Sequence, residues 1–348
     1  MAQIDKPNLH FNTNLYTGNG STQHSITGVG FQPDLVWIKG RGSTYSHFWF
    51  DAVRGAGKQI YSNSTAIEAT NNNNLYSFDS DGFSLAQSGN DDVTNQNNIN
   101  FASWNWKAAN SAGSSNTDGS ITSTVSANTT AGFSIVSYTG NGSDGATVGH
   151  GLGVTPSCII FKNRSDVQYW VVYHKELGGA NNHLRLDTTA ATSTSLNMFS
   201  STAPTSSVFE IGTQPQVNGN TNNIIAYCFA EKKGFSKFGK YTGNGSANGP
   251  FVYTGFKPAM VILKNTSTTG NWQIMDNKRN TDNPVDTLLK PNDTIADQTP
   301  SDAKDFLSNG FKLRKSATED NGNANTFIYM AFAENPIVGS NNIAAVAE

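Results

Sequence analysis

One six-residue phrase, Tyr-Thr-Gly-Asn-Gly-Ser, occurs three times in this chain of 348 residues and constrains its fold more than any other feature. In every copy a lysine follows a proline by 6 residues, and a polar residue follows that lysine by 12. Such regular spacing across weak identity predicts three copies of one fold, each of about 95 residues. The equivalent positions are Tyr16, Tyr138 and Tyr241; Pro33, Pro156 and Pro258; Lys39, Lys162 and Lys264; Asp51, His174 and Asp276; and Trp106, Phe229 and Phe332.

The repeats divide the chain into modules. We predict a first β module at 1–109, a second at 131–237, a third at 238–336 and a C-terminal tail at 337–348. Residues 110–130 are rich in Ser, Thr and Asn and nearly uncharged, which favours a linker. The apolar positions Ile121 and Val125 leave open an additional edge strand there.

The pattern inside each module is typical of β-strands. Short continuous apolar runs at 35–39, 158–162 and 260–264 suit strands that are buried on both faces. Clusters of Gly, Asn and Asp separate these runs, as expected for turns. Helix-like character is confined to 301–308. We therefore predict an all-β protein of three tandem β-sandwich or jelly-roll-like modules joined by short linkers.

Composition excludes several classes of function. Charged residues are 14% of the chain, against roughly 25% in ordinary soluble domains, and the net charge of −3 argues against a nucleic-acid ligand. No apolar run is long enough for a membrane span, and the N-terminus lacks the features of a signal peptide, so we expect synthesis in a cytoplasm. The two cysteines, Cys158 and Cys228, are interpreted as unpaired packing residues, although a bond between neighbouring strands remains an alternative.

No motif of catalysis survives inspection. The string Gly140-Asn-Gly142-Ser-Asp-Gly145 matches a dinucleotide fingerprint, but no helix can follow it, so a turn between strands explains it better. The six histidines lack metal-ligand spacing. We predict no catalytic residue, no cofactor and no metal site, with a structural cation among the Asp/Asn-rich loops as the alternative.

The strongest polar pattern is the repeated pairing of Lys39 with Asp51, Lys162 with His174, and Lys264 with Asp276. A binding feature used three times is one interpretation. The plainer one is structural: an exposed salt bridge that fixes a turn, also indicated by Asp51-x-x-Arg54 and Asp276-x-x-Arg279, and worth little stability.

Three tryptophans are candidates for stacking on a glycan. Trp49, Trp170 and Trp272 adjoin the loops, whereas the other three align with core positions of the sister modules. Flat aromatic faces suit sugar recognition. Packing in the interior is the alternative role.

Several longer stretches resemble a known family. They include Gly-Phe-Gln-Pro-Asp-Leu-Val-Trp-Ile-Lys (30–39), Asp-Ala-Val-Arg-Gly (51–55), Trp-Asn-Trp-Lys-Ala (104–108), Gly-His-Gly-Leu-Gly-Val-Thr-Pro (149–156) and Asp-Phe-Leu-Ser-Asn-Gly-Phe-Lys-Leu-Arg (305–314). They are similar to repeat-bearing structural proteins of marine tailed bacteriophages, of the cyanophage and pelagiphage type. Members of that family are described as virion structural or tail-fibre proteins, sometimes as lectin-like.

The resemblance implies a non-enzymatic protein on the outer surface of a virion. It would bind copies of itself, for example as a trimer, and other tail or capsid proteins. The leading hypothesis is a tail-fibre or appendage protein that contributes to attachment to a host-surface glycan. The alternatives are a capsid decoration protein that stabilises the shell and a glycan depolymerase, whose candidate acids are Glu176, Glu210 and Glu231 with Asp166 or Asp187.

Overall fold

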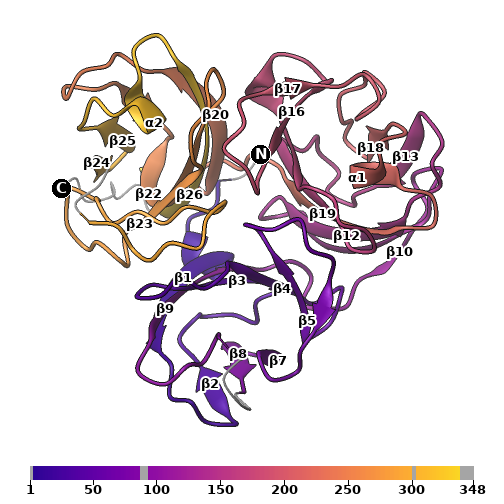
Figure 1. Ribbon diagram of the computed structural model, residues 1–348, viewed down its shortest axis with the longest axis horizontal. Coiled ribbons are helices and arrows are strands. Elements are labelled where there is room, and N and C mark those ends of the chain that lie inside the picture. The colour runs from indigo at the N-terminus through magenta and orange to yellow at the C-terminus, as the bar shows by residue number, and fades with distance from the viewer. Residues whose placement is uncertain (1–2, 87–92, 300–302, 338–348) are drawn as a thin grey trace.

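The computed structural model describes residues 3–86, 93–299 and 303–337, and this part of the chain is built almost wholly of antiparallel β-strands. The all-β prediction is therefore confirmed. Three lobes surround a common centre (Figure 1), and each lobe holds one copy of the repeat. Each copy forms a larger sheet and a smaller sheet.

The first repeat forms a larger sheet of order β1-β9-β3-β4-β5-β6 and a smaller sheet of order β2-β8-β7. Its elements are η1 (Pro7–Leu9), β1 (Phe11–Thr17), β2 (His24–Ile26), β3 (Leu35–Gly40), β4 (Phe48–Asp51), β5 (Lys58–Tyr61), β6 (Ala69–Thr70), β7 (Leu75–Asp79), β8 (Gly82–Leu85) and β9 (Asn100–Trp106).

The second repeat forms the sheet β10-β11-β12-β19-β14-β15-β16-β17 and the pair β13-β18. Residues 110–130 are not a plain linker, because β10 and β11 pair with β12 and extend this sheet; the alternative of an additional strand near Ile121 and Val125 fits β11. The elements are β10 (Ser114–Asn116), β11 (Ser123–Asn128), β12 (Phe133–Thr139), β13 (Ala146–Gly149), β14 (Cys158–Asn163), β15 (Val171–His174), η2 (Lys175–Leu177), β16 (Asn182–Arg185), β17 (Ser193–Thr194), β18 (Val208–Ile211), α1 (Pro215–Asn218) and β19 (Asn223–Phe229).

The third repeat forms the sheets β20-β26-β22-β23 and β21-β25-β24. The helix-like pattern at 301–308 is misleading, because strand β24 occupies its described part and turns Phe306 into the core. Of the predicted tail, residues 338–348 lie outside the described residues. The elements are β20 (Ser236–Thr242), β21 (Phe251–Tyr253), β22 (Phe256–Asn265), β23 (Gln273–Asp276), β24 (Lys304–Leu307), β25 (Gly310–Leu313), α2 (Thr318–Asn321) and β26 (Thr326–Pro336).

The register of the larger sheets explains the constant spacings in the sequence. In each repeat, the first residue of the apolar run faces the late aromatic residue on one side and the polar residue on the other. The paired residues are Leu35 with Trp106 and Asp51, Cys158 with Phe229 and His174, and Met260 with Phe332 and Asp276.

Strand β3 is buried along its whole length, as predicted for a strand covered on both faces. Val36 and Ile38 point into a core between the two sheets of the first lobe. Leu35 and Trp37 point the other way, into a core that all three repeats share. The period of two along a strand sends alternate side chains to these two cores.

The shared core lies on an approximate threefold axis. Trp106, Phe229 and Phe332 hold equivalent positions in the three repeats and meet edge to face, with ring centroids 6.2, 5.5 and 5.9 Å apart. Such geometry is favoured for aromatic pairs. The prediction of three modules joined by short linkers did not include this shared interior, around which the three repeats close.

The repeated Tyr-Thr-Gly-Asn-Gly-Ser phrase has a structural explanation. The hydroxyl of Tyr16 donates to the carbonyl of Thr94 at 2.7 Å, and the side chain of buried Asn95 accepts from the backbone NH of Asn19. A Cβ on Gly18 would lie 2.1 Å from the carbonyl oxygen of Gln96, so a larger residue cannot fit. The other copies repeat these contacts through Val217 and Asn218, and through Asp320 and Asn321.

Candidate binding site between the second and third repeats

Each repeat reaches across the boundary to its neighbour, here called a seam, with a buried lysine. Lys39 Nζ donates to Gly40 O, Ser43 O and, across the seam, Thr294 O at 3.1 Å. Lys162 donates to Thr65 O at 3.2 Å, and Lys264 to Thr189 O at 3.0 Å. Burial lowers the pKa of each of these three ammonium groups to about 8, although nearby carboxylates raise it in part.

The predicted pairing of these lysines with Asp51, His174 and Asp276 is therefore wrong. In each repeat the lysine and the Asp or His lie on neighbouring strands, but their side chains bind different partners. The lysines bind backbone carbonyls, whereas the aspartates bind arginines.

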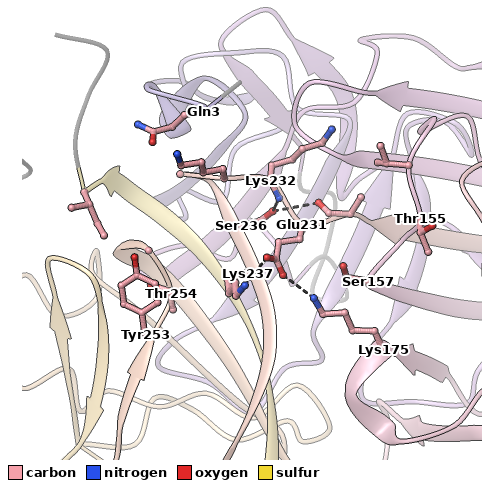
Figure 2. Close-up of a pocket in the computed structure, with 16 residues that line it drawn as sticks. Gln3, Thr155, Ser157, Lys175, Glu231, Lys232, Ser236, Lys237, Tyr253 and Thr254 are labelled. Atoms are coloured by element: carbon pink, nitrogen blue, oxygen red, sulfur yellow. Dashed lines mark hydrogen bonds and ion pairs between the residues drawn. The ribbon is translucent and has the colours of Figure 1, made fainter. Parts of the chain in front are cut away.

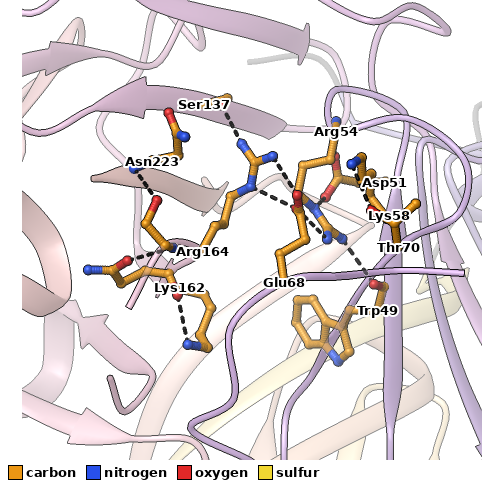
Figure 3. A network of polar contacts seen from close by, with 12 residues as sticks. Trp49, Asp51, Arg54, Lys58, Glu68, Thr70, Ser137, Lys162, Arg164 and Asn223 are labelled. Atoms are coloured by element: carbon orange, nitrogen blue, oxygen red, sulfur yellow. Dashed lines mark hydrogen bonds and ion pairs between the residues drawn. The ribbon is translucent and has the colours of Figure 1, made fainter. Parts of the chain in front are cut away.

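The seam between the first and second repeats is closed by a charged network (Figure 3). Arg54 pairs with Asp51, and both side chains are fully buried. Glu68 then links Arg54, at 3.3 Å, to Arg164 of the second repeat, at 2.8 Å. The hydroxyl of Tyr227 donates to Asp51 across the seam at 2.7 Å. The local pair Asp51–Arg54 was expected from the sequence, but it is a buried seam contact and not an exposed one.

The seam between the third and first repeats uses the same design. Arg279 pairs with Asp276 at 2.6 Å and with Asp297 at 3.0 Å. Arg41 of the first repeat binds Asp297 at 2.7 Å, and Trp104 Nε1 donates to Asp276 at 3.1 Å. Each of these two seams is thus held by a buried Asp–Arg pair, by a second acid of the same repeat, and by an arginine of the neighbouring repeat.

The seam between the second and third repeats replaces the Asp–Arg pair by His174 and Leu177, both buried. His174 Nδ1 accepts from the backbone NH of Glu176 at 3.2 Å, which leaves Nε2 to donate to Tyr329 O at 3.3 Å. Burial lowers the pKa of the His174 imidazole to about 3, so the ring is neutral at pH 7.

This burial predicts acid sensitivity. An unfolded histidine has a pKa near 6.5, and the folded pKa of about 3 means that the unfolded state takes up a proton first as the pH falls. His174 therefore contributes stability that is complete above about pH 6.5 and is lost progressively toward pH 3. Between pH 7 and 4.5 we expect the free energy of unfolding to fall by about 2–3 kcal/mol on its account.

The measurement is urea unfolding at several pH values for the wild type and for His174→Asn, whose amide oxygen replaces the acceptor Nδ1. The variant should lose that part of the pH dependence. Other histidines whose pKa burial lowers, among them His47 and His183, contribute to the pH dependence of both proteins alike. Identical pH profiles for the two proteins would contradict the assignment.

The three candidate glycan-stacking tryptophans lie in the interior. Trp49, Trp170 and Trp272 are at most 1% exposed. Trp170 Nε1 donates to Tyr61 O and Trp272 Nε1 to Arg185 O, both at 2.8 Å and both across a seam. Their proposed role is wrong, because the neighbouring repeat covers the sheet face that a single module would expose.

A pocket of about 810 Å³ opens in the seam between the second and third repeats (Figure 2). Glu231 accepts from Lys175 at 2.9 Å and from Lys237 at 2.6 Å. Burial would raise the pKa of the Glu231 carboxyl, but these two ammonium groups lower it more, so it lies below its ordinary range. The charged and aromatic lining residues are Lys175, Glu231, Lys232, Lys233, Lys237 and Tyr253.

The sequence argument missed this site, although one feature could have indicated it. Residues 231–233 read Glu-Lys-Lys, a charge-dense run in a chain with only 14% charged residues. Tyr253 could not have been singled out, because its 59% exposure depends on the packing of β21 at the edge of the pocket.

The lining of the pocket carries an excess of positive charge. Four lysines and one glutamate line it, whereas the whole chain carries a net charge of −3. The same lining offers the exposed ring of Tyr253 as an apolar surface. Within the described ranges, no cluster of three or more His, Cys, Asp or Glu side chains has the geometry of a metal site.

A family model described as a domain of unknown function (DUF7483) matches residues 6–336. The chain belongs to the DUF7483 family. No curated protein and no solved structure matches this DUF7483 chain.

No helix in the described part of the chain is long and apolar enough to cross a membrane. Both cysteines, Cys158 and Cys228, are free and buried, as interpreted from the sequence.

Proposed function

We propose that this DUF7483 protein is a non-enzymatic structural protein on the outer surface of a bacteriophage virion, where it contributes to attachment to a host-surface glycan. The observation that supports this most directly is the seam pocket, which offers ammonium groups and an aromatic ring but a single carboxylate. Such a lining suits the binding of a ligand more than its conversion.

The strongly shifted titratable groups also favour a structural role. Shifted pKa values often mark catalytic residues. Here Lys39, Lys162 and Lys264, whose pKa values fall to about 8, donate to backbone carbonyls, and buried Arg54 and Arg279 pair with acids inside the seams. Each of these groups is committed to holding one repeat against the next.

The depolymerase hypothesis has weaker support. Cleavage of a glycosidic bond uses two carboxyl groups, one of which is kept protonated as the general acid. Glu231 has a pKa lowered by two lysines, which opposes that role, and Glu176 pairs with Lys240 at 3.4 Å. Glu210 lies on β18, in the smaller sheet of the second repeat.

The approximate threefold axis favours one second candidate, a capsid decoration protein. A chain with three similar lobes matches in shape a site of threefold symmetry, and threefold axes are among the symmetries of closed assemblies. In either role the proposed partners are copies of itself and other tail or capsid proteins.

Cryo-electron microscopy of the intact phage particle tests the location. The attachment proposal predicts three-lobed density of this size on the tail or at its distal end. Density spread over the icosahedral head would overturn the tail location in favour of decoration. Absence of the protein from purified particles, checked by mass spectrometry, would overturn both.

A further inference from the structure

The three seams differ at the place where the pocket lies. Sheet register makes three positions of each seam equivalent: the residue that follows the polar strand-end residue, the second residue after the late aromatic, and the second residue of the neighbour's first strand. They hold Ala52, Ala108 and Ser134 in the first seam; Lys175, Glu231 and Lys237 in the second; and Asn277, Glu334 and Asn12 in the third. Two lysines thus face one glutamate only in the seam between the second and third repeats.

The size of the hollow differs as well. The pocket at the corresponding place between the third and first repeats measures about 260 Å³ and contains Lys278 as its one lysine. The pocket between the second and third repeats measures about 810 Å³. Folding of three similar repeats around one axis does not require the extra lysines or the larger space.

The lysines retain capacity for a ligand. An ammonium group has three donors, and Lys175 and Lys237 each spend one of them on Glu231. Their side chains are 35% exposed, so their remaining donors are open to an anion in the pocket. Glu231 holds the two ammonium groups in place beside each other.

The exposed ring of Tyr253 lines the same pocket as these cations, and Phe251 precedes it on the same strand, outside the lining. Phe251 and Tyr253 lie two residues apart on β21 and therefore project to the same face of the strand. Their side chains are 44% and 59% exposed, which is unusual for two large rings side by side. Apolar ring faces pack well against the C–H faces of sugars.

We propose that this pocket binds an anionic saccharide, with Lys175 and Lys237 holding its acid group and Tyr253 stacking on a sugar ring. The inference names a ligand class for the proposed attachment function and rests on it. Lysines act as point charges and take a carboxylate or a sulfate equally, so the shared chemistry is an acidic oligosaccharide.

Isothermal titration calorimetry on the full chain tests the proposal with three tetrasaccharides. Tetragalacturonate carries carboxylates, a carrageenan tetrasaccharide carries sulfates, and cellotetraose is neutral. We expect at least one acidic probe to bind with a Kd at least tenfold lower than that of cellotetraose, and more weakly as salt increases. Comparable binding of both acidic probes assigns the site to acidic oligosaccharides in general, and binding of one alone identifies the acid group.

Three variants test the roles of the lysines and of the tyrosine. Lys175→Asn together with Lys237→Asn installs the asparagines of the third seam and should raise the Kd at least tenfold. Tyr253→Ala should raise it at least fivefold without changing the midpoint of unfolding, because the ring is exposed. Lys278→Asn removes the same charge from the smaller pocket and should leave the Kd within twofold.

Three outcomes would overturn the inference: binding of neither acidic probe, equal binding of cellotetraose, or equal weakening by Lys278→Asn and the double variant. An unchanged Kd for Tyr253→Ala would reduce the site to an anion site and reject the saccharide. These failures are distinct from failure of the proposed function, which depends on where the protein lies on the particle.

Discussion

Replacing Asp51 by histidine is expected to cost about 3–5 kcal/mol of the free energy of unfolding, because it leaves a buried guanidinium without its carboxylate. Arg54 and Asp51 are both fully buried, and Arg54 keeps only Glu68, at 3.3 Å, as a second acidic partner. Asp51 also accepts from Tyr227 across the seam. Urea unfolding at pH 8, followed by tryptophan fluorescence, measures the loss while the new histidine is neutral.

The seam between the second and third repeats supplies the rescue. There His174 and Leu177 stand where the first repeat has Asp51 and Arg54, at the same spacing. Adding Arg54→Leu to Asp51→His should therefore recover at least about 2 kcal/mol, since no unpaired charge remains. Glu68 keeps its two contacts with Arg164, at 2.8 and 2.9 Å, in the double variant.

An exposed acid provides the control. Asp282→His changes the same chemical group at the surface and should alter stability by less than about 0.5 kcal/mol. Additive losses from Asp51→His and Arg54→Leu would show that the pair does not act as a unit. A loss from Asp51→His no larger than that of the control would show that the seam does not depend on the buried pair.

Local pattern predicted much of this fold. The apolar runs identified strands buried on both faces, and the constant spacings identified the register, because paired residues on neighbouring strands keep fixed separations in every copy. The same comparison would also have found the buried asparagines, since Asn95, Asn218 and Asn321 follow the opening tyrosines by 79, 80 and 80 residues.

The arrangement of the repeats could not be predicted in this way. A surface tryptophan and a tryptophan that packs against a neighbouring repeat have the same local pattern, so Trp170 looked available for a ligand although Tyr61 and Ser64 of the first repeat cover it. The pocket escaped prediction for the same reason. Lys175, Lys237 and Tyr253 come from η2, β20 and β21, and they meet only when the second and third repeats close around the axis.

The shared core makes a further prediction, that the three repeats lose structure together. Phe332 lies 5.1 Å from Phe11, 5.5 Å from Trp106 and 5.9 Å from Phe229, measured between ring centroids. Removing this ring in Phe332→Ala leaves a cavity bordered by all three repeats and should cost about 3–5 kcal/mol. Hydrogen exchange followed by mass spectrometry should then show faster exchange in β9 and β19 as well as in β26, although the substituted residue belongs to the third repeat.

The matched control is Phe311→Ala, which removes an equally buried ring from the core that the third lobe keeps between its own two sheets. Its cost should be similar, but local opening should concentrate in β21, β24 and β25, because the hydrophobic residues of that core all belong to the third repeat in the described part of the chain. If Phe332→Ala accelerated exchange only in the third repeat, the repeats would open independently and the axis would be a contact between separate units. Faster exchange in all three repeats with Phe332→Ala, and not with Phe311→Ala, is the result that a single interior shared around the axis requires.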